Sequence, residues 1–135
     1  MKYLLDSNTC IEHFRRGAAS PATNRILASP TTDIALCSIV RAELMTGARK
    51  TNDPIAAAKR IERFASVFLS LPFDDVAADR YADVRSRLER IGTPIGPNDM
   101  LIAAIALQHG LTVVTNNVRE FRRVPGLSVE DWSQP

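Results

Sequence analysis

Short apolar runs alternate along this chain with longer stretches in which apolar residues recur every three or four positions. Runs of the first kind are typical of buried strands, and the second spacing is typical of helices with one face on a core. We therefore expect strands at residues 2–5, 34–38, 69–71, 111–114 and 127–129. We expect helices at residues 40–45, 54–68, 75–91 and 100–109, and a further helix directly after the first strand.

Polar residues and glycines mark the expected ends of these helices. The segment Asp6-Ser7-Asn8 follows the first apolar run and can cap the helix after it. Asn98 is expected to be the N-cap of the helix at residues 100–109. Glycines are expected to end three helices, at Gly17, Gly47 and Gly110. A polar segment around Pro21 and Pro30 separates the first helix from the second strand.

The alternation of strands and helices favours one architecture. Each strand is apolar on both faces, which indicates a sheet covered by helices on two sides, and parallel strands need the helical crossovers that the pattern supplies. We expect an α/β fold, a three-layer α/β/α sandwich with a mostly parallel central sheet. The 135 residues contain no internal repeat and no long linker, so residues 1–135 are expected to form a single domain.

The residues that follow the strands are the first place to look for chemistry. In open α/β sheets, ligands bind beyond the carboxyl ends of the strands, where Asp6 and the segment Thr115-Asn116-Asn117 lie. Asp99 lies in the first turn of an apolar helix, where unpaired backbone N–H groups favour an ionised carboxylate. Clustered carboxylates are the ligands that Mg²⁺ or Mn²⁺ requires.

Each acidic residue also has a purely structural explanation. Asp6 can be only a helix cap, Glu43 only a solvated helix residue, and Asp99 only a favourable charge at a helix start. The combination favours a metal site, because Asp6 after a buried strand and Asp99 before a buried helix would be costly to hold close together without a cation.

Composition and charge narrow the classes further. The net charge is only +2, so the total gives no sign of attraction to nucleic acid. Nearly all cations are arginine, which suits bidentate phosphate contacts. The codon usage of a high-GC genome would produce the same arginine bias. Cys10 and Cys37 lie in apolar stretches without metal-ligand spacing and are expected to be reduced core residues. The amino terminus lacks the apolar length of a signal peptide and no window approaches a membrane span, so we expect a cytoplasmic protein without a membrane partner.

Four motifs in order along the chain carry a family resemblance. They are LLDSNTCIEHFR, SIVRAELMTGARK, IGPNDMLIAAIALQHGLTVVTNNVREF and VPGLSVEDW. Together they resemble the PIN-domain family and, more closely, its VapC branch, the toxin half of bacterial toxin–antitoxin pairs. The resemblance implies a PIN-like fold and a hydrolase that is an Mg²⁺- or Mn²⁺-dependent endoribonuclease.

The resemblance also assigns roles to particular residues. It implies that Asp6, Glu43 and Asp99 are the catalytic, metal-binding acids, with metal-activated water cutting the phosphodiester. It places polar supports for these acids at Asn8 and Ser38. Many PIN domains carry a fourth Asp where this chain has Thr115-Asn116-Asn117, so we interpret Asn117 as a support and expect that Glu120 can supply the missing charge.

Binding of RNA and of partner proteins follows from the same resemblance. Arg119, Arg122 and Arg123 follow the late strand and are candidates to hold RNA phosphates, although a solvated charged surface explains each of them equally well. The implied substrate is RNA. A tRNA is the leading candidate, for example initiator tRNA cut in its anticodon loop. The implied partners are a VapB-like antitoxin and a second copy of the chain in a homodimer.

Two rival functions remain at this point. An inactive PIN-like RNA-binding module is disfavoured by the presence of Asp6, Glu43 and Asp99. A phosphatase of the haloacid-dehalogenase type also has an Asp after its first strand, but it needs a second Asp two residues later, where this chain has Asn8.

Overall fold

The computed structural model describes all residues from Met1 to Pro135. Its five strands form one sheet in the order β3-β2-β1-β4-β5, and every neighbouring pair is parallel. The strands are β1 (Tyr3–Leu5), β2 (Ile34–Cys37), β3 (Leu69–Leu71), β4 (Thr112–Val114) and β5 (Val129–Glu130). The expectation of a parallel central sheet is confirmed.

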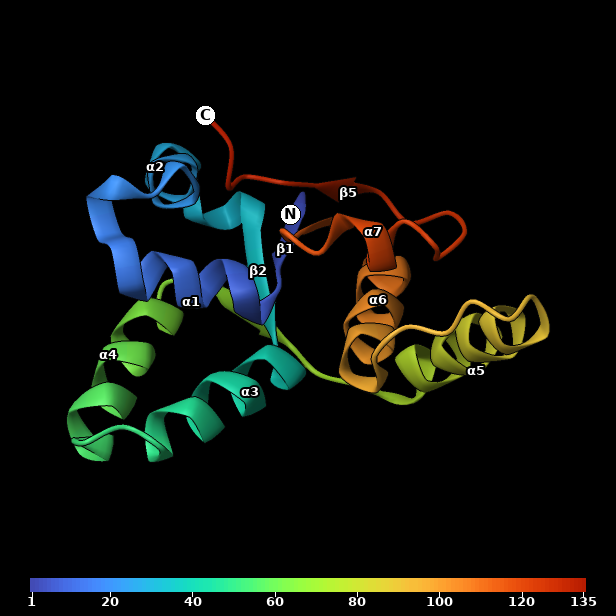
Figure 1. Cartoon of the computed structure of the whole chain (residues 1–135), viewed down its shortest axis with the longest axis horizontal. Helices are drawn as coiled ribbons and strands as arrows, with labels where there is room; N and C mark the ends of the chain where they lie inside the picture. The colour runs from blue at the N-terminus through green and yellow to red at the C-terminus, as the bar shows by residue number, and fades with distance from the viewer.

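Seven α-helices cover the two faces of this sheet (Figure 1). One face carries α1 (Ser7–Arg16), α2 (Pro21–Ala28), α3 (Ser38–Arg49) and α4 (Pro54–Ala65), on the left in Figure 1. The other carries α5 (Asp75–Arg90), α6 (Pro97–His109) and α7 (Val118–Phe121). Short 3-10 turns at Gly17–Ala19 and Thr31–Asp33 complete the chain. The three-layer α/β/α sandwich is therefore confirmed.

Two expectations about helix ends need correction. The helix that carries Asp99 begins at Pro97 with Gly96 as its N-cap, so Asn98 lies inside the first turn. Proline suits this first position because the N–H it lacks has no helical partner there. The third helix runs past Gly47 to Arg49, since other contacts outweigh the modest cost of one helical glycine.

The polar segment around Pro21 contains a helix that the apolar pattern did not predict. Ser20 caps α2 by accepting a hydrogen bond from the N–H of Thr23 at 3.4 Å, and Pro21 occupies its first turn. Only Ala22, Thr23 and Ile26 are buried, so its apolar face is narrow. This is why its polar and small residues concealed the helical period.

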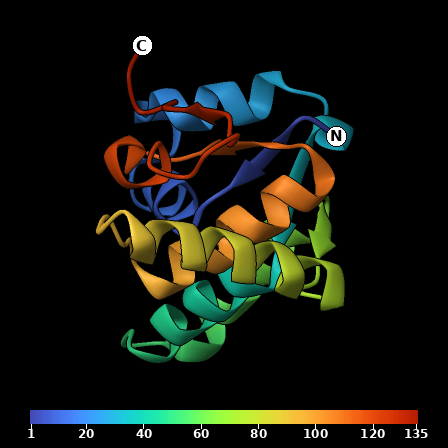
Figure 2. The same ribbon diagram turned by 90° about the vertical axis from the view of Figure 1, so that its right-hand side faces the viewer.

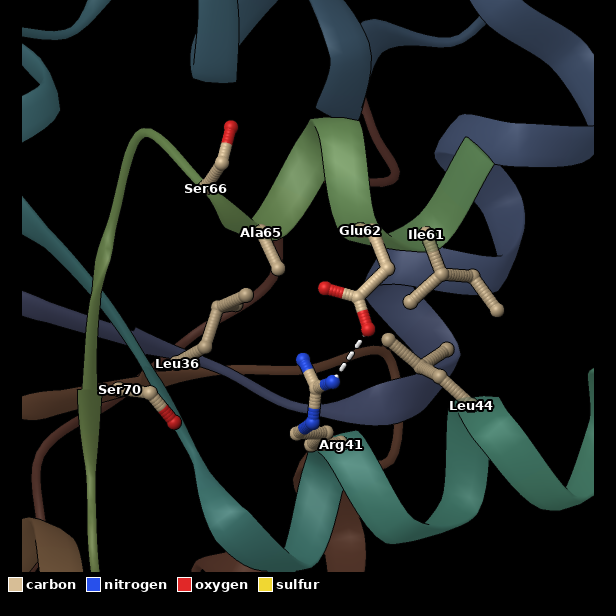
Figure 3. Close-up of a pocket in the computed structure, with 8 residues that line it drawn as sticks. All are labelled: Leu36, Arg41, Leu44, Ile61, Glu62, Ala65, Ser66 and Ser70. Atoms are coloured by element: carbon tan, nitrogen blue, oxygen red, sulfur yellow. Dashed lines mark hydrogen bonds and ion pairs between the residues drawn. The ribbon is translucent and has the colours of Figure 1, made fainter. Parts of the chain in front are cut away.

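The core lies between the sheet and the helices that cross it. Helix α6 is buried throughout residues 102–106, and α5 packs on its outer side (Figure 2). On the opposite face, α3 and α4 meet over Leu36, Leu44 and Ile61, where an ion pair between Arg41 and Glu62 bridges the two helices (Figure 3). None of the helices is both long and apolar enough to span a lipid bilayer.

The strand order decides where a site can form. Helical crossovers lead from β1 outward to β2 and β3, and the chain then returns to the other side of β1 to form β4. Ligands of open α/β sheets bind at such a reversal, beyond the carboxyl ends of the two strands. The N–H of Asp6 donates to the carbonyl of Val114 at 3.0 Å, so the residues after β1 and β4 are direct neighbours.

Candidate active site

Asp6 is the most buried acid of the chain, with 3% of its surface exposed. Its Oδ1 accepts the N–H of Thr9 at 2.9 Å, as an N-cap does, which fixes the carboxylate at the start of α1. The hydroxyl of Thr9 donates to the carbonyl of Val114 at 3.1 Å and ties this turn to β4. Burial raises the pKa of Asp6, while hydrogen bonds from Thr115 and Thr9 act in the opposite direction.

Glu43 approaches the same place from α3. The hydroxyl of Ser7 donates to its Oε1 at 3.1 Å, which joins the first turn of α1 to the second turn of α3. Glu43 is close enough to Asp6 for its negative charge to contribute to the raised pKa of that carboxyl group. The tertiary fold therefore brings together two acids that lie 37 residues apart in sequence.

Asp99 lies in the first turn of α6 and faces the other acids. Its pKa is raised to about 7, first by burial and then by the hydrogen bond and charge of Glu120, with further contributions from Asp6 and Glu43. The positive end of the α6 dipole does not offset this combined effect. The three acids predicted from the sequence are therefore brought to one edge of the sheet.

Glu120 is a fourth acid at the site. The side-chain amide of Asn117 donates to Oδ2 of Asp99 at 3.3 Å and to Oε2 of Glu120 at 2.5 Å. The N–H of Asn117 itself donates to the hydroxyl of Thr115 at 2.9 Å, which anchors it to the end of β4. Asn117 thus supports two acids, and Glu120 provides a carboxylate from α7.

The four carboxyl groups have no cationic partner in the protein. None of the five ion pairs of the structure includes Asp6, Glu43, Asp99 or Glu120. Such a cluster is electrostatically unfavourable by itself, and oxygen ligands of this type suit a hard divalent cation. No three of these side chains are already drawn together as a finished ligand set, so some of them would have to rotate around an ion.

Two of the expected supports lie elsewhere. The side chain of Asn8 is exposed and lines a separate polar hollow with Asn116 and Arg15. The hydroxyl of Ser38 accepts the N–H of Phe73 at 3.3 Å and ties the start of α3 to the segment after β3. In this structure Asp6 is bonded instead by Thr9 and Thr115, Glu43 by Ser7, and Asp99 by Asn117.

The three arginines after β4 differ in their surroundings. Arg119 and Arg122 are exposed and make no ion pair, whereas a guanidinium N–H of Arg123 donates to the carbonyl of Pro94 at 2.9 Å. Arg123 therefore fastens α7 to the segment that leads into α6. All three lie on elements adjoining Asp99 and Glu120.

The buried cysteines are not part of a metal set. Cys10 and Cys37 are both free and buried, as expected. Burial raises the pKa of both thiols, which disfavours the thiolate that binds metal ions or attacks a substrate.

Comparison with known proteins gives consistent results. The PIN domain family model matches residues 3–127. The chain is 39% identical to the tRNA(fMet)-specific endonuclease VapC of Salmonella typhimurium, over 98% of both chains, and 35% identical to ribonuclease VapC2 of Rickettsia felis, over 99% and 100% of the respective chains.

Solved structures agree in fold as well. The crystal structure of DNA-bound VapBC from Salmonella typhimurium superposes with a TM-score of 0.91 over 98% of each chain at 39% identity. The structure of VapBC2 from Rickettsia felis bound to a promoter DNA fragment gives a TM-score of 0.88 at 35% identity, over 98% of this chain and 99% of the other.

Proposed function

The chain belongs to the PIN-domain family and is a VapC ribonuclease of the toxin–antitoxin type, and on that premise we propose that it cuts a transfer RNA at the cluster of Asp6, Glu43, Asp99 and Glu120. The observation that carries the proposal is geometric: Asn117 bonds both Asp99 and Glu120, Ser7 bonds Glu43 beside Asp6, and none of these acids has an ion-pair partner in the protein. This is the environment that a divalent cation stabilises.

The cofactor of the proposed reaction is Mg²⁺ or Mn²⁺. A bound ion of this kind makes a water nucleophilic and stabilises negative charge that develops on the phosphodiester. Asp6, Glu43 and Asp99 would hold the ion. Glu120, whose carboxylate accepts a hydrogen bond from Asn117, would complete the set of ligands. Thr9 and Thr115 fix Asp6, and Ser7 fixes Glu43, so these hydroxyls orient the ligands before an ion arrives.

A transfer RNA is the proposed substrate. Two relatives that are 39% identical over nearly the full chain are tRNA(fMet)-specific endonucleases, and the TNNVREF segment of this chain places Asn117 beside Asp99. The exposed Arg119 and Arg122 lie on the same edge of the sheet and would bind phosphates next to the cut.

The proposed protein partner is a VapB-like antitoxin. Several solved relatives are complexes of VapC with VapB. In this chain an apolar hollow of about 260 Å³ between α1, α3 and α4 is lined by Ile11, Phe14, Leu44 and Ile61 and has Glu43 at its border. An amphipathic segment of an antitoxin would fit there and would cover the acids. The expected homodimer remains a prediction, to be checked by sedimentation.

One experiment tests the nuclease and its substrate together. Purified protein is incubated with initiator tRNA, elongator tRNAs and a total RNA preparation, with Mg²⁺, with Mn²⁺ and with EDTA. We expect a discrete product from initiator tRNA that disappears with EDTA and with Asp99→Asn. Asp79→Asn is the matched control, because Asp79 is an exposed acid on α5.

The possible outcomes separate the alternatives. Cleavage that persists in EDTA or in Asp99→Asn contradicts the metal mechanism. Equal cleavage of all tRNAs contradicts the substrate assignment but not the nuclease. Binding of RNA without any cleavage identifies an inactive RNA-binding module.

A further inference from the structure

A second hollow lies away from the acids, between α5, α6 and the turn that follows α7. It has a volume of about 560 Å³, and one wall is formed by Arg80, Asp83, Arg87 and Arg90 of α5. The arginines are seven and three residues apart, so they lie on one face of the helix. The opposite wall is formed by Leu107 of α6 and the turn Pro125-Gly126, which follows α7. Figure 2 shows the carboxyl-terminal end of α5 beneath this turn.

The three arginines carry charge that the protein leaves unpaired. None of Arg80, Arg87 and Arg90 takes part in an ion pair, and all three are exposed. Arg85 differs, because its guanidinium bonds Glu89 at 2.7 Å and Tyr81 at 3.1 Å and it does not line the hollow. Asp83 is the one acid in the lining. In a chain with a net charge of +2, this face concentrates positive charge.

The position of this face relative to the acids is fixed by packing. Helix α5 packs along α6, which carries Asp99 in its first turn. Leu107 lies eight residues beyond Asp99, which corresponds to about 12 Å along the helix axis at 1.5 Å per residue. The two sites are therefore separated by a short distance on a rigid pair of helices.

We propose that this arginine face binds the phosphate backbone of the RNA substrate at a point removed from the cut. The inference rests on the proposed ribonuclease function and deepens it, since it implies recognition of a folded RNA that spans both sites. Guanidinium groups bind phosphate oxygens bidentately, and such contacts set the position of a nucleic acid without reading its bases. An acidic protein partner is the less favoured occupant, because the substrate of the proposed function is itself a polyanion and this face lies on the helix that packs against α6.

The test compares two RNA substrates and two variants. The variant Arg87→Gln/Arg90→Gln removes two guanidiniums from the hollow, and Arg85→Gln removes one from another part of the same helix. Cleavage is measured with full-length initiator tRNA and with a short RNA hairpin that carries only the cut site. We expect the double variant to raise KM for the full tRNA about tenfold with kcat within twofold, and to leave cleavage of the hairpin unchanged.

The dependence of tRNA binding on salt gives an independent readout. For each lost phosphate contact the slope of log affinity against log salt should fall by about 0.7 to 0.9. Arg85→Gln should behave as the unmodified protein in both measurements.

Three results would overturn the inference. If both variants cleave full tRNA as the unmodified protein does, the face does not bind the substrate, although the ribonuclease function stands. If the double variant loses hairpin cleavage equally, the arginines act at the cut and not away from it. If it changes the oligomeric state in sedimentation, the face is a contact between protein chains. Absence of all cleavage by the unmodified protein overturns the proposed function itself.

Discussion

The side-chain amide nitrogen of Asn117 lies 3.3 Å from Oδ2 of Asp99, and the same amide donates to Glu120. A neutral donor thus occupies the position between two carboxyl groups. We expect Asn117→Asp to destabilise the metal-free protein by about 1–3 kcal/mol at pH 8, since a donor is replaced by a further negative charge. Unfolding in urea with EDTA measures this.

Divalent cations should offset much of the loss in Asn117→Asp, so its melting temperature should rise more with Mn²⁺ than that of the unmodified protein. Asn116→Asp is the control, because Asn116 is the exposed neighbour. An equal Mn²⁺ response in both variants would show that Asn117 does not face the ion.

The raised pKa of Asp99 predicts how stability depends on pH without metal. Its carboxyl group titrates near 7 in the folded protein and near 3.8 when unfolded, so the folded state binds more protons between these values. Stability from this group is therefore fully present below about pH 4 and is lost as the pH rises through 7.

Asp99→Asn should remove that loss. We expect the metal-free variant to exceed the unmodified protein by about 1–3 kcal/mol at pH 8, allowing for partial solvent screening, and by little at pH 4. Urea unfolding at the two pH values checks this, with Asp79→Asn as reference. A variant that is less stable at pH 8 would refute the electrostatic explanation.

Metal affinity should follow the same titration. A cation that binds Asp99 must displace its proton below pH 7, so affinity should fall by up to about tenfold per pH unit as the pH decreases further. Calorimetric titration with Mn²⁺ at pH 6 and pH 8 measures the effect and the protons released. Equal affinities at the two pH values would place the ion away from Asp99.

Thr115 links Asp6 to Asn117 through one buried hydroxyl. Thr115→Val keeps the volume but leaves the N–H of Asn117 without its acceptor, which should cost about 1–3 kcal/mol of stability. We also expect a lower kcat, because both side chains lose orientation. Thr112→Val, at the start of β4 and outside the site, should change neither quantity appreciably. A kcat that is equal in the two variants would contradict the role of Thr115.

Much of the architecture was predictable from local pattern. Strands such as Ile34–Cys37 are continuous apolar runs, and the helix through residues 102–106 is apolar throughout, so burial alone identifies them. The helix at Pro21–Ala28 was missed because only a narrow face of it is buried. Its capping residue Ser20 was the available signal.

The structure brings some of the predicted site residues together and leaves others apart, for physical reasons that can be separated. The sequence by itself determined that Asp6 follows a buried strand and that Asp99 starts a buried helix, because both follow from burial and helix-end electrostatics. Only the tertiary structure decided which polar groups meet them. The order β3-β2-β1-β4-β5 places Thr115 and Asn117 beside these acids and leaves Asn8 and Ser38 elsewhere. Long-range proximity depends on strand order, and no local pattern encodes the neighbours that this order creates.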